Sequence, residues 1–99
     1  MTDRNYEWDD PKRESNLRKH GFDFNDAVRL FDVWHNIARS EGYGEARWKV
    51  TAPFDGLWVT AVYTMRGDVV RIISMRSARN NEQHDYHKNF ALRGSEGQK

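Results

Sequence analysis

An alternation of apolar and polar side chains across the middle third of the chain restricts its fold more than any other feature. In residues 46–51 every second residue is apolar, which is the two-residue period of a half-buried strand. Residues 57–65 and 68–77, rich in Val and Ile, continue the pattern as a second and a third strand. Turns are predicted between them at residues 53–56 and at Arg66-Gly67. The sequence therefore predicts an antiparallel sheet with one apolar and one polar face.

The two turns also predict which residues face each other across the strands. A four-residue loop at 53–56 places Ala52 opposite Leu57, and a two-residue turn at Arg66-Gly67 places Met65 opposite Asp68. On the polar face this register gathers a row of three residues and two neighbours: Arg47, Val62 and Arg71, with Lys49 and Thr60 beside them.

The third strand is the least certain part of this register. Arg76 falls on the apolar side by parity, at the end of its strand, where a bend could expose it. A one-residue bulge in the hairpin would flip the third strand and remove Arg71 from the polar row. The position of the arginines therefore depends on the regularity of one hairpin.

Two helices are predicted ahead of the sheet. Asp10 is the expected N-cap of the first, Pro11 occupies its first turn, and Gly21 ends it. Asp23 begins the second, which carries apolar residues at helical spacing and ends near Asp32. The apolar face of the sheet is expected to pack under both.

Weaker signals complete the expected architecture. Residues 6–8 are predicted to form a short edge strand, residues 34–38 a further strand, and residues 80–90 a last helix capped by an asparagine. We therefore expect one α+β domain over residues 1–92, followed by a polar, glycine-containing disordered tail over residues 93–99.

Composition excludes several classes of protein. The chain has no cysteine, so disulfides and thiol chemistry are absent. The acidic N-terminus lacks the apolar run of a signal peptide, and no segment is long enough to span a bilayer. His84 and His87 are spaced as metal ligands but lack a third partner, and a solvated helix face explains them. We expect a soluble, cytoplasmic protein that uses neither a metal nor a cofactor.

Charge is balanced over the whole chain but not within the sheet. There are 16 basic and 15 acidic residues, whereas between Thr60 and Arg79 four arginines stand against the single acid Asp68. Guanidinium groups stay charged and offer phosphate a bidentate fork. The polar face over residues 47–77 therefore predicts a surface that binds RNA. The alternative is that these arginines are ordinary solvated residues paired with acids.

Most of the chain contains residues that follow one another in the same order as in the sequence pattern of one protein family. These residues are Glu7-Trp8-Asp9, Lys12, Asn16, Lys19-His20-Gly21, Phe24, Ala27, Phe31, Gly44-Glu45, Arg47, Arg71-Ile72-Ile73-Ser74-Met75-Arg76, Ala78, Glu82 and Tyr86. In this order, over residues 6–86, the chain resembles the BrnT toxins. The Lys-His-Gly helix end and the Arg-Ile-Ile-Ser-x-Arg strand are its more specific parts.

The resemblance implies a type II toxin that cleaves RNA and inhibits translation and growth. It implies a fold similar to RelE, with two N-terminal helices packed on an antiparallel sheet and a C-terminal helix. The implied partner is a BrnA-type antitoxin, a small ribbon-helix-helix protein that blocks the toxin and represses the shared operon. Operator DNA is then contacted only through the antitoxin.

Metal-independent cleavage of RNA needs a base for the 2′-hydroxyl, an acid for the leaving 5′-oxygen and cations for the charged phosphorane. Arg47, Arg71 and Arg76 are the candidate cations, and His20 is the candidate acid or base. Tyr86 offers a phenol or a stacking ring. The alternatives are helix C-capping for His20 and core packing for Tyr86.

Other polar residues are expected to contact RNA around this centre. Lys19, Lys49 and Arg79 are the candidate phosphate ligands, with simple solvation as the alternative. Glu45 is a candidate base, although most acidic residues in loops have no chemical role.

Two further functions stay open at this point. The first is an RNA- or antitoxin-binding module of the same fold without activity. The second is a structural subunit whose arginine face docks an acidic protein, which predicts no salt-sensitive binding of RNA.

Overall fold

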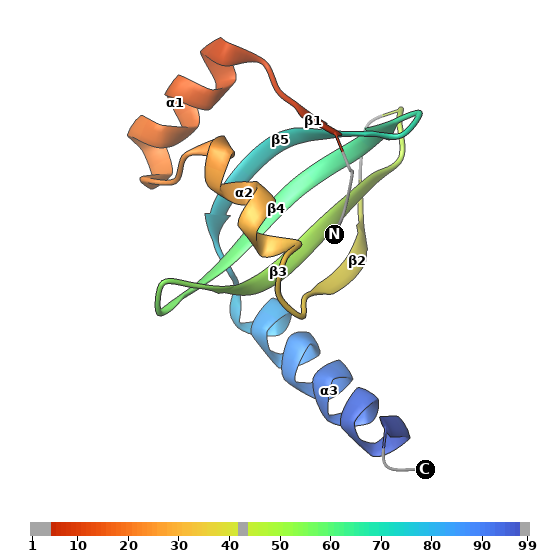
Figure 1. The fold of residues 1–99 in the computed structure, drawn as a ribbon. Coiled ribbons are helices and arrows are strands. Elements are labelled where there is room, and N and C mark those ends of the chain that lie inside the picture. Colours follow the sequence, from red (N-terminus) through yellow and green to blue (C-terminus); the bar gives the residue numbers. More distant parts are fainter. Residues whose placement is uncertain (1–4, 42–43, 98–99) are drawn as a thin grey trace.

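The structure, a computed structural model, describes residues 5–41 and 44–97, the last four by their backbone alone. Its elements, in chain order, are β1 (Asn5–Glu7), α1 (Asp10–His20), η1 (Phe24–Asp26), α2 (Ala27–Leu30), β2 (Asn36–Ser40), β3 (Arg47–Phe54), β4 (Leu57–Arg66), β5 (Val69–Ser77) and α3 (Asn80–Gly97). Figure 1 shows α2 across one face of a curved sheet, α1 beyond β5, and α3 extending away from the body. The predicted α+β class is confirmed. In this part of the chain no helix is long and apolar enough to cross a membrane.

The strands form one sheet in the order β1-β5-β4-β3-β2. From β2 to β5 neighbouring strands are antiparallel, but β1 runs parallel to β5, with Tyr6 opposite Val70. The short edge strand near residues 6–8 is therefore confirmed, while the expectation of a wholly antiparallel sheet is wrong. No hairpin turn joins β1 to β5, so nothing local forces the antiparallel direction.

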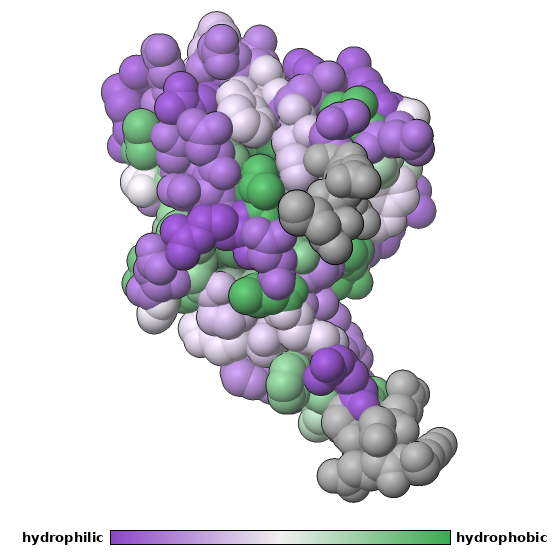
Figure 2. Space-filling model, viewed as in Figure 1, coloured by the Kyte–Doolittle hydropathy of each residue, from purple (hydrophilic) through white to green (hydrophobic). Residues whose placement is uncertain are grey.

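Helix α1 forms where the sequence predicts it, with a change of one residue at its start. The N-cap is Asp9 rather than Asp10, and its carboxylate accepts a hydrogen bond from the Lys12 N–H (3.2 Å). At the other end Gly21 has a φ of 78°, and its N–H donates to the Leu17 carbonyl. The surface of α1 is mostly hydrophilic (Figure 2), which fits a helix that covers an edge of the sheet rather than its core.

One buried side chain fixes α1 to the sheet. β1 pairs with β5 only as far as Arg71, so the following residues of β5 need other partners on that side. The Asn16 amide donates to the Met75 carbonyl (2.8 Å) and accepts from the Met75 N–H (3.1 Å). It therefore replaces a strand at this edge, because it satisfies both backbone groups of one residue.

The second predicted helix is shorter than expected. It begins as the 3₁₀ turn η1, continues as α2, and ends at Leu30 rather than near Asp32. Phe24, Ala27 and Leu30 are completely buried. Their spacing of three residues matches the three-residue turn of a 3₁₀ helix, which aligns them on one side facing the sheet.

The core lies between this segment and the apolar face of the sheet. The strands contribute the buried side chains of Val50, Ala52, Val59, Ala61, Tyr63, Val70, Ile72 and Met75. The predicted division of the sheet into an apolar and a polar face is therefore confirmed.

The predicted register is wrong by two residues at both hairpins. Phe54 faces Leu57 across a turn of only two residues, and Arg66 faces Val69 across the other turn. Val62 lies opposite Lys49 on β3 and, after a further shift of one residue at a bulge, opposite Ser74 on β5, so the predicted row Arg47–Val62–Arg71 does not exist. An even shift keeps every side chain on its own face, which explains why the faces were predicted correctly.

A β-bulge in β5 changes the position of Arg76. Tyr63 pairs with Ile72, but the preceding Val62 pairs with Ser74, so Ile73 is the extra residue. Beyond the bulge Arg76 pairs with Thr60 of the polar face, while Arg71 pairs with Thr64 of the same face. The expectation that Arg76 falls on the apolar side is therefore wrong, because the bulge reverses the parity of the strand after Arg71.

Helix α3 begins at Asn80, so the predicted asparagine cap is wrong: Arg79 precedes the first helical residue, and the helix continues to Gly97, beyond the expected end near Phe90. Its first turns pack on β2 and β3, and the rest extends away from the body (Figure 1). The division into a domain over residues 1–92 and a tail over 93–99 stays a prediction.

Candidate functional site

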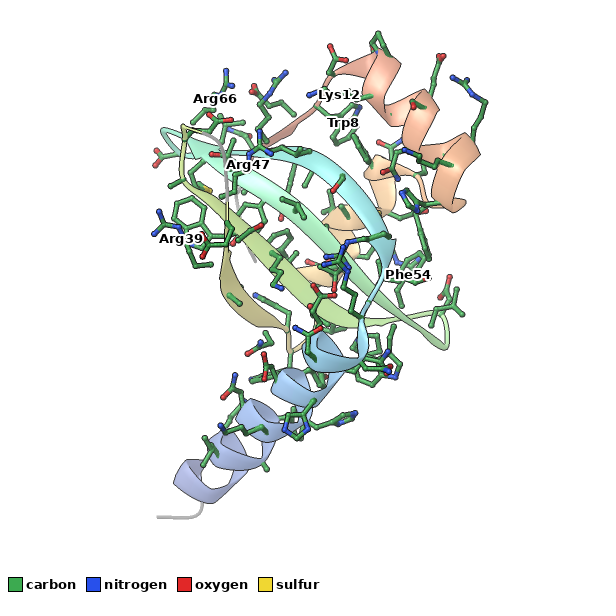
Figure 3. All side chains as sticks on the ribbon, turned by 180° about the vertical axis from the view of Figure 1, so that it is seen from behind. Trp8, Lys12, Arg39, Arg47, Phe54 and Arg66 are labelled. Carbon is green, nitrogen blue, oxygen red and sulfur yellow. The ribbon has the colours of Figure 1, made fainter. Side chains whose placement is uncertain are left out.

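The polar face of the sheet is the largest collection of predicted site residues. Figure 3 looks onto this face, and no helix of the described chain crosses it, although α3 begins at one end. Its polar side chains come from the three central strands: Arg47, Lys49, Thr51, Thr60, Thr64, Arg71, Ser74 and Arg76. Thr51, Thr60 and Thr64 are buried, so the part of the face that a ligand can reach is formed by the half-buried side chains of Arg47, Lys49, Arg71, Ser74 and Arg76.

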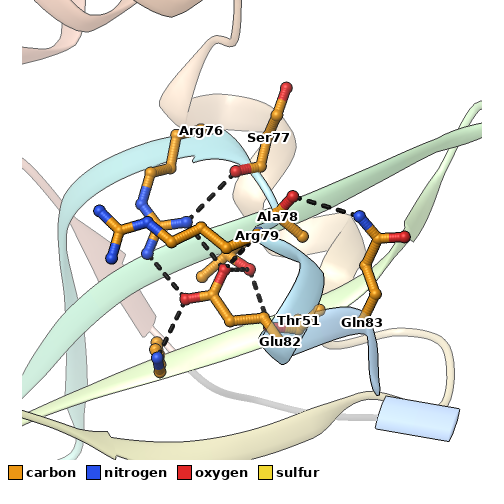
Figure 4. Close-up of polar contacts among 9 residues, drawn as sticks. Thr51, Arg76, Ser77, Ala78, Arg79, Glu82 and Gln83 are labelled. Carbon is orange, nitrogen blue, oxygen red and sulfur yellow. Dashed lines mark hydrogen bonds and ion pairs between the residues drawn. The ribbon is translucent and has the colours of Figure 1, made fainter. Parts of the chain in front are cut away.

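A carboxylate from α3 organises one end of this face (Figure 4). Glu82 accepts two hydrogen bonds from the Arg76 guanidinium, both 2.8 Å, and one from the Lys49 ammonium at 3.0 Å. The Thr60 hydroxyl donates to the same carboxylate at 3.0 Å and contacts the Thr51 hydroxyl at 2.8 Å. We refer to Lys49, Thr51, Thr60, Arg76 and Glu82 as the Glu82 cluster.

The Glu82 cluster is buried and its charges are fixed. Glu82 is 3% exposed, and Thr60 is completely buried. Burial acts to raise the pKa of Glu82, but hydrogen bonds from Arg76, from the Arg79 N–H and from Lys49 outweigh it and hold this pKa well below its usual range. The bond to Glu82 raises the pKa of Arg76 in turn. Glu82 is thus ionised at neutral pH and too weak a base to remove a proton from a hydroxyl.

The same carboxylate caps the helix that carries it. The Arg79 N–H, just before the first residue of α3, donates to Glu82 Oε1 at 2.8 Å. A glutamate three residues after a helix start that reaches back to the backbone is half of a capping box. The predicted RNA ligand Arg79 therefore contributes its backbone to the cluster, while its side chain is exposed.

The other two predicted arginines lie toward the opposite end of the face and also face acids. Arg71 donates to Glu7 of β1 at 2.8 Å. Arg47 lies 4.0 Å from Glu45, which is also 3.7 Å from Arg66. The Arg47 Nε is buried without a hydrogen-bond partner among the described atoms. Glu45, the candidate base, is thus shared between two guanidinium groups.

His20 and Lys19 lie in a separate depression between α1 and β5. The pocket has a volume of about 200 Å³ and is lined by Lys12, Ser15, Asn16, Lys19, His20, Ile73 and Ser74. We refer to it as the α1 pocket. It adjoins the Glu82 cluster because Ser74 lines the pocket and also lies on the polar face, two residues and about 7 Å along β5 from Arg76.

Tyr86 belongs to an aromatic group rather than to the polar face. Its ring contacts those of Trp34 (4.9 Å) and Trp58 (4.8 Å), and its hydroxyl donates to the Trp34 carbonyl at 3.4 Å. Burial raises the pKa of its phenol. The structure brings Tyr86 to no other predicted site residue, and its surroundings are those of a packing residue.

Sequence reasoning missed the residue with the most polar contacts at this site. Glu82 is among the residues that carry the family resemblance, but no role is assigned to it from the sequence. Its position three residues after the helix start was the available signal. Among the described side chains, no three histidines or acids are grouped to hold a metal ion.

Comparison with known proteins gives the site a family. Residues 8–82 match a family model described as the ribonuclease toxin BrnT of type II toxin-antitoxin systems. The match includes α1, the whole of the polar face and Glu82. No curated protein matches the chain. Because the family model covers well over half of the sequence, the chain belongs to the BrnT family of ribonuclease toxins of type II toxin-antitoxin systems.

Proposed function

We propose that the chain is an endoribonuclease that cleaves RNA without a metal ion, by attack of a ribose 2′-hydroxyl on the neighbouring phosphate. The observation that carries this proposal is the junction at Ser74, where the α1 pocket with His20 meets the Glu82 cluster with Arg76. An acid–base group and fixed cations are thus available to one stretch of RNA, in a chain of a ribonuclease family.

In this mechanism each bond change has a residue that assists it. The 2′-hydroxyl loses its proton and its oxygen bonds to phosphorus, while the bond from phosphorus to the 5′-oxygen breaks and that oxygen takes up a proton. The products are a 2′,3′-cyclic phosphate and a 5′-hydroxyl. His20 accepts the proton of the 2′-hydroxyl and donates a proton to the departing 5′-oxygen, because an imidazole can act as both a base and an acid. Arg76 stabilises the charge that develops on the phosphate oxygens. Arg47 and Arg71 contact the RNA at the far end of the polar face.

Glu82 is a positioning residue in this proposal. It holds Arg76 and Lys49 by three hydrogen bonds before RNA arrives, so the cations are oriented in advance. Each cation keeps further N–H groups for phosphate. Arg76 has five N–H donors and gives two to Glu82 and one to the Ser77 carbonyl, and Lys49 has three and gives one. The remaining exposure of Arg76 (18%) and Lys49 (22%) leaves those groups open to the face.

We also propose the biological setting that the family suggests. The toxin acts in the cytoplasm and is held inactive by a BrnA-like ribbon-helix-helix antitoxin. It reaches operator DNA only through this antitoxin.

One observation favours a second candidate, a binding module without catalytic activity. Each cation predicted for catalysis faces an acid: Arg71 faces Glu7, Arg47 faces Glu45, and Arg76 faces Glu82. Such pairing is the arrangement of structural ion pairs, and it reduces the positive charge that a phosphate meets.

Cleavage of a defined RNA separates the two candidates. The purified chain is incubated with end-labelled single-stranded RNA in EDTA, and the product ends are examined for 2′,3′-cyclic phosphate. The ribonuclease cuts this RNA but not the same strand with 2′-deoxyribose. Arg76→Ala lowers the cleavage rate about 10²–10³-fold, as loss of one transition-state donor does.

The matched control is Arg29→Ala. Arg29 is 55% exposed on α2, pairs with Asp55 and lies away from the polar face. This variant should cleave like the wild type. If wild-type protein that binds the RNA leaves it intact, the non-catalytic module is the correct function.

A further inference from the structure

The basic side chains of the α1 pocket differ from those of the sheet in their partners. Lys12, Lys19 and His20 converge on one depression, and no acidic side chain is among the described residues that line it. Within the described chain none of the three forms an ion pair, whereas Lys49, Arg71 and Arg76 all do. Within the described residues, the pocket thus gathers three basic side chains that form no ion pair.

The remaining lining groups suit a phosphate with its attached sugar. Ser15 and Ser74 offer hydroxyl donors from opposite walls, and the side chain of Ile73 offers an apolar surface. The Asn16 amide is already bonded to Met75 and Phe22, so it serves as a fixed wall. The volume of about 200 Å³ corresponds to six or seven waters at the ~30 Å³ that each occupies in the liquid.

The β-bulge explains why this pocket exists next to the sheet. Ile73 is the extra residue of the bulge, so β5 bends at the point where α1 crosses its edge. A regular strand would place Ile73 and Ser74 on opposite faces and would separate the pocket from the polar face. The bulge instead gives one continuous path from Lys12 and Lys19 past Ser74 to Arg76.

From this geometry we propose that the α1 pocket is a second phosphate-binding subsite, which holds a backbone phosphate of the RNA strand next to the one at Arg76. Lys12, Ser15 and Ser74 join Lys19 as its phosphate ligands, and His20 stands between the two phosphates. This subsite rests on the proposed function, because its ligand is the substrate of the same enzyme. It predicts that RNA binding depends on α1 as well as on the sheet.

The test measures binding separately from cleavage. A fluorescently labelled, single-stranded RNA with 2′-O-methyl riboses lacks the attacking hydroxyl, so anisotropy reports affinity alone. Lys12→Ala should weaken binding several-fold, and the slope of log K against log salt should become shallower by about 0.7, the value for one phosphate contact with a single strand.

The matched control is Arg18→Ala, which removes the same charge from the same helix. Arg18 is exposed and is not among the residues that line the pocket. Its affinity should stay within twofold of the wild type, and its salt slope should differ by no more than about 0.2, because the change removes no phosphate contact. Circular dichroism melts confirm that both variants fold.

The outcomes distinguish this subsite from the proposed function. Equal effects of Lys12→Ala and Arg18→Ala, or no effect of Lys12→Ala, would exclude the subsite. So would a wild-type protein that does not bind the 2′-O-methyl strand. A strand that binds with the expected Lys12 dependence, while unmodified RNA stays intact, would support the subsite and reject the ribonuclease.

Discussion

The Glu82 cluster and the α1 pocket hold similar cations in opposite ways. In the cluster Lys49 and Arg76 are half-buried, each bonded to a carboxylate that is 3% exposed. In the pocket Lys12 and Lys19 are exposed, and within the described chain neither forms an ion pair. Buried, paired cations are rigid and contribute to folding, while exposed, unpaired cations keep their full charge for a ligand. The difference predicts that one region determines stability and that the other determines the salt dependence of binding.

The largest effect on stability is expected at Glu82. Glu82→Gln removes the charge that Arg76 and Lys49 share and leaves two half-buried cations without a counter-ion. Loss of one partner from a buried ion pair costs about 3–5 kcal/mol, and glutamine, which still accepts hydrogen bonds, is expected near the lower end. Urea denaturation gives this free energy of unfolding.

The control for this change is Glu14→Gln, on the exposed surface of α1. It should change the free energy of unfolding by less than about 0.5 kcal/mol. If the two variants lose the same stability, the Glu82 cluster is no more than a solvated surface group, and the contrast between the regions fails.

The cluster could be predicted from the sequence only in part. The alternation of apolar and polar residues assigns Lys49 and Thr60 to the polar face. This assignment is correct despite the register error, because a shift of two residues keeps each side chain on its face. Gly21 ended α1 because a residue with positive φ is needed there. These features are local, and a local pattern is enough to predict them.

The bulge at Ile73 and the burial of Glu82 depend on parts of the chain that are far apart. A bulge leaves no clear mark in a run such as Ile72-Ile73-Ser74, because either register gives acceptable side chains. Glu82 is buried because the first turn of α3 lies at one end of the polar face, where Lys49 of β3, Thr60 of β4 and Arg76 of β5 surround its carboxylate. Arg76 is only six residues away, but Thr60 and Lys49 lie 22 and 33 residues from Glu82, so no local pattern shows that they meet it.

A pH titration of stability sharpens the comparison, because of the two regions only the Glu82 cluster contains a carboxylate of shifted pKa. The folded-state pKa of Glu82 lies below the ordinary value of 4.5. A depressed folded pKa contributes stability that is complete above the unfolded pKa and is lost as the pH falls toward the folded one. The stability difference between wild type and Glu82→Gln should therefore be constant from pH 7 to about 5.5 and shrink below about 4.5.

Urea denaturation of both proteins across this pH range gives the difference directly. Glu14→Gln supplies the baseline for the general effect of acid on the fold. If the stability difference already shrinks between pH 7 and 6, the partners of Glu82 do not hold it ionised. If the stability difference is unchanged at pH 3, the charge of Glu82 does not contribute to stability.

The smallest effect compares one lysine from each region. Lys49→Ala removes one of the charged hydrogen bonds to Glu82, which is worth about 1.5–3 kcal/mol when it is buried and less at the 22% exposure of this side chain, so we expect about 1–2 kcal/mol. Lys12→Ala removes an exposed cation without an ion-paired acid and should change the free energy of unfolding by less than about 0.5 kcal/mol.

Both free energies of unfolding come from urea denaturation, repeated at high salt. Salt should leave the cost of Lys49→Ala nearly unchanged, because a half-buried pair is screened far less than an exposed charge. Equal costs for the two lysines would show that pairing with Glu82 adds nothing to the fold, and the α1 pocket and the Glu82 cluster would then differ only in position.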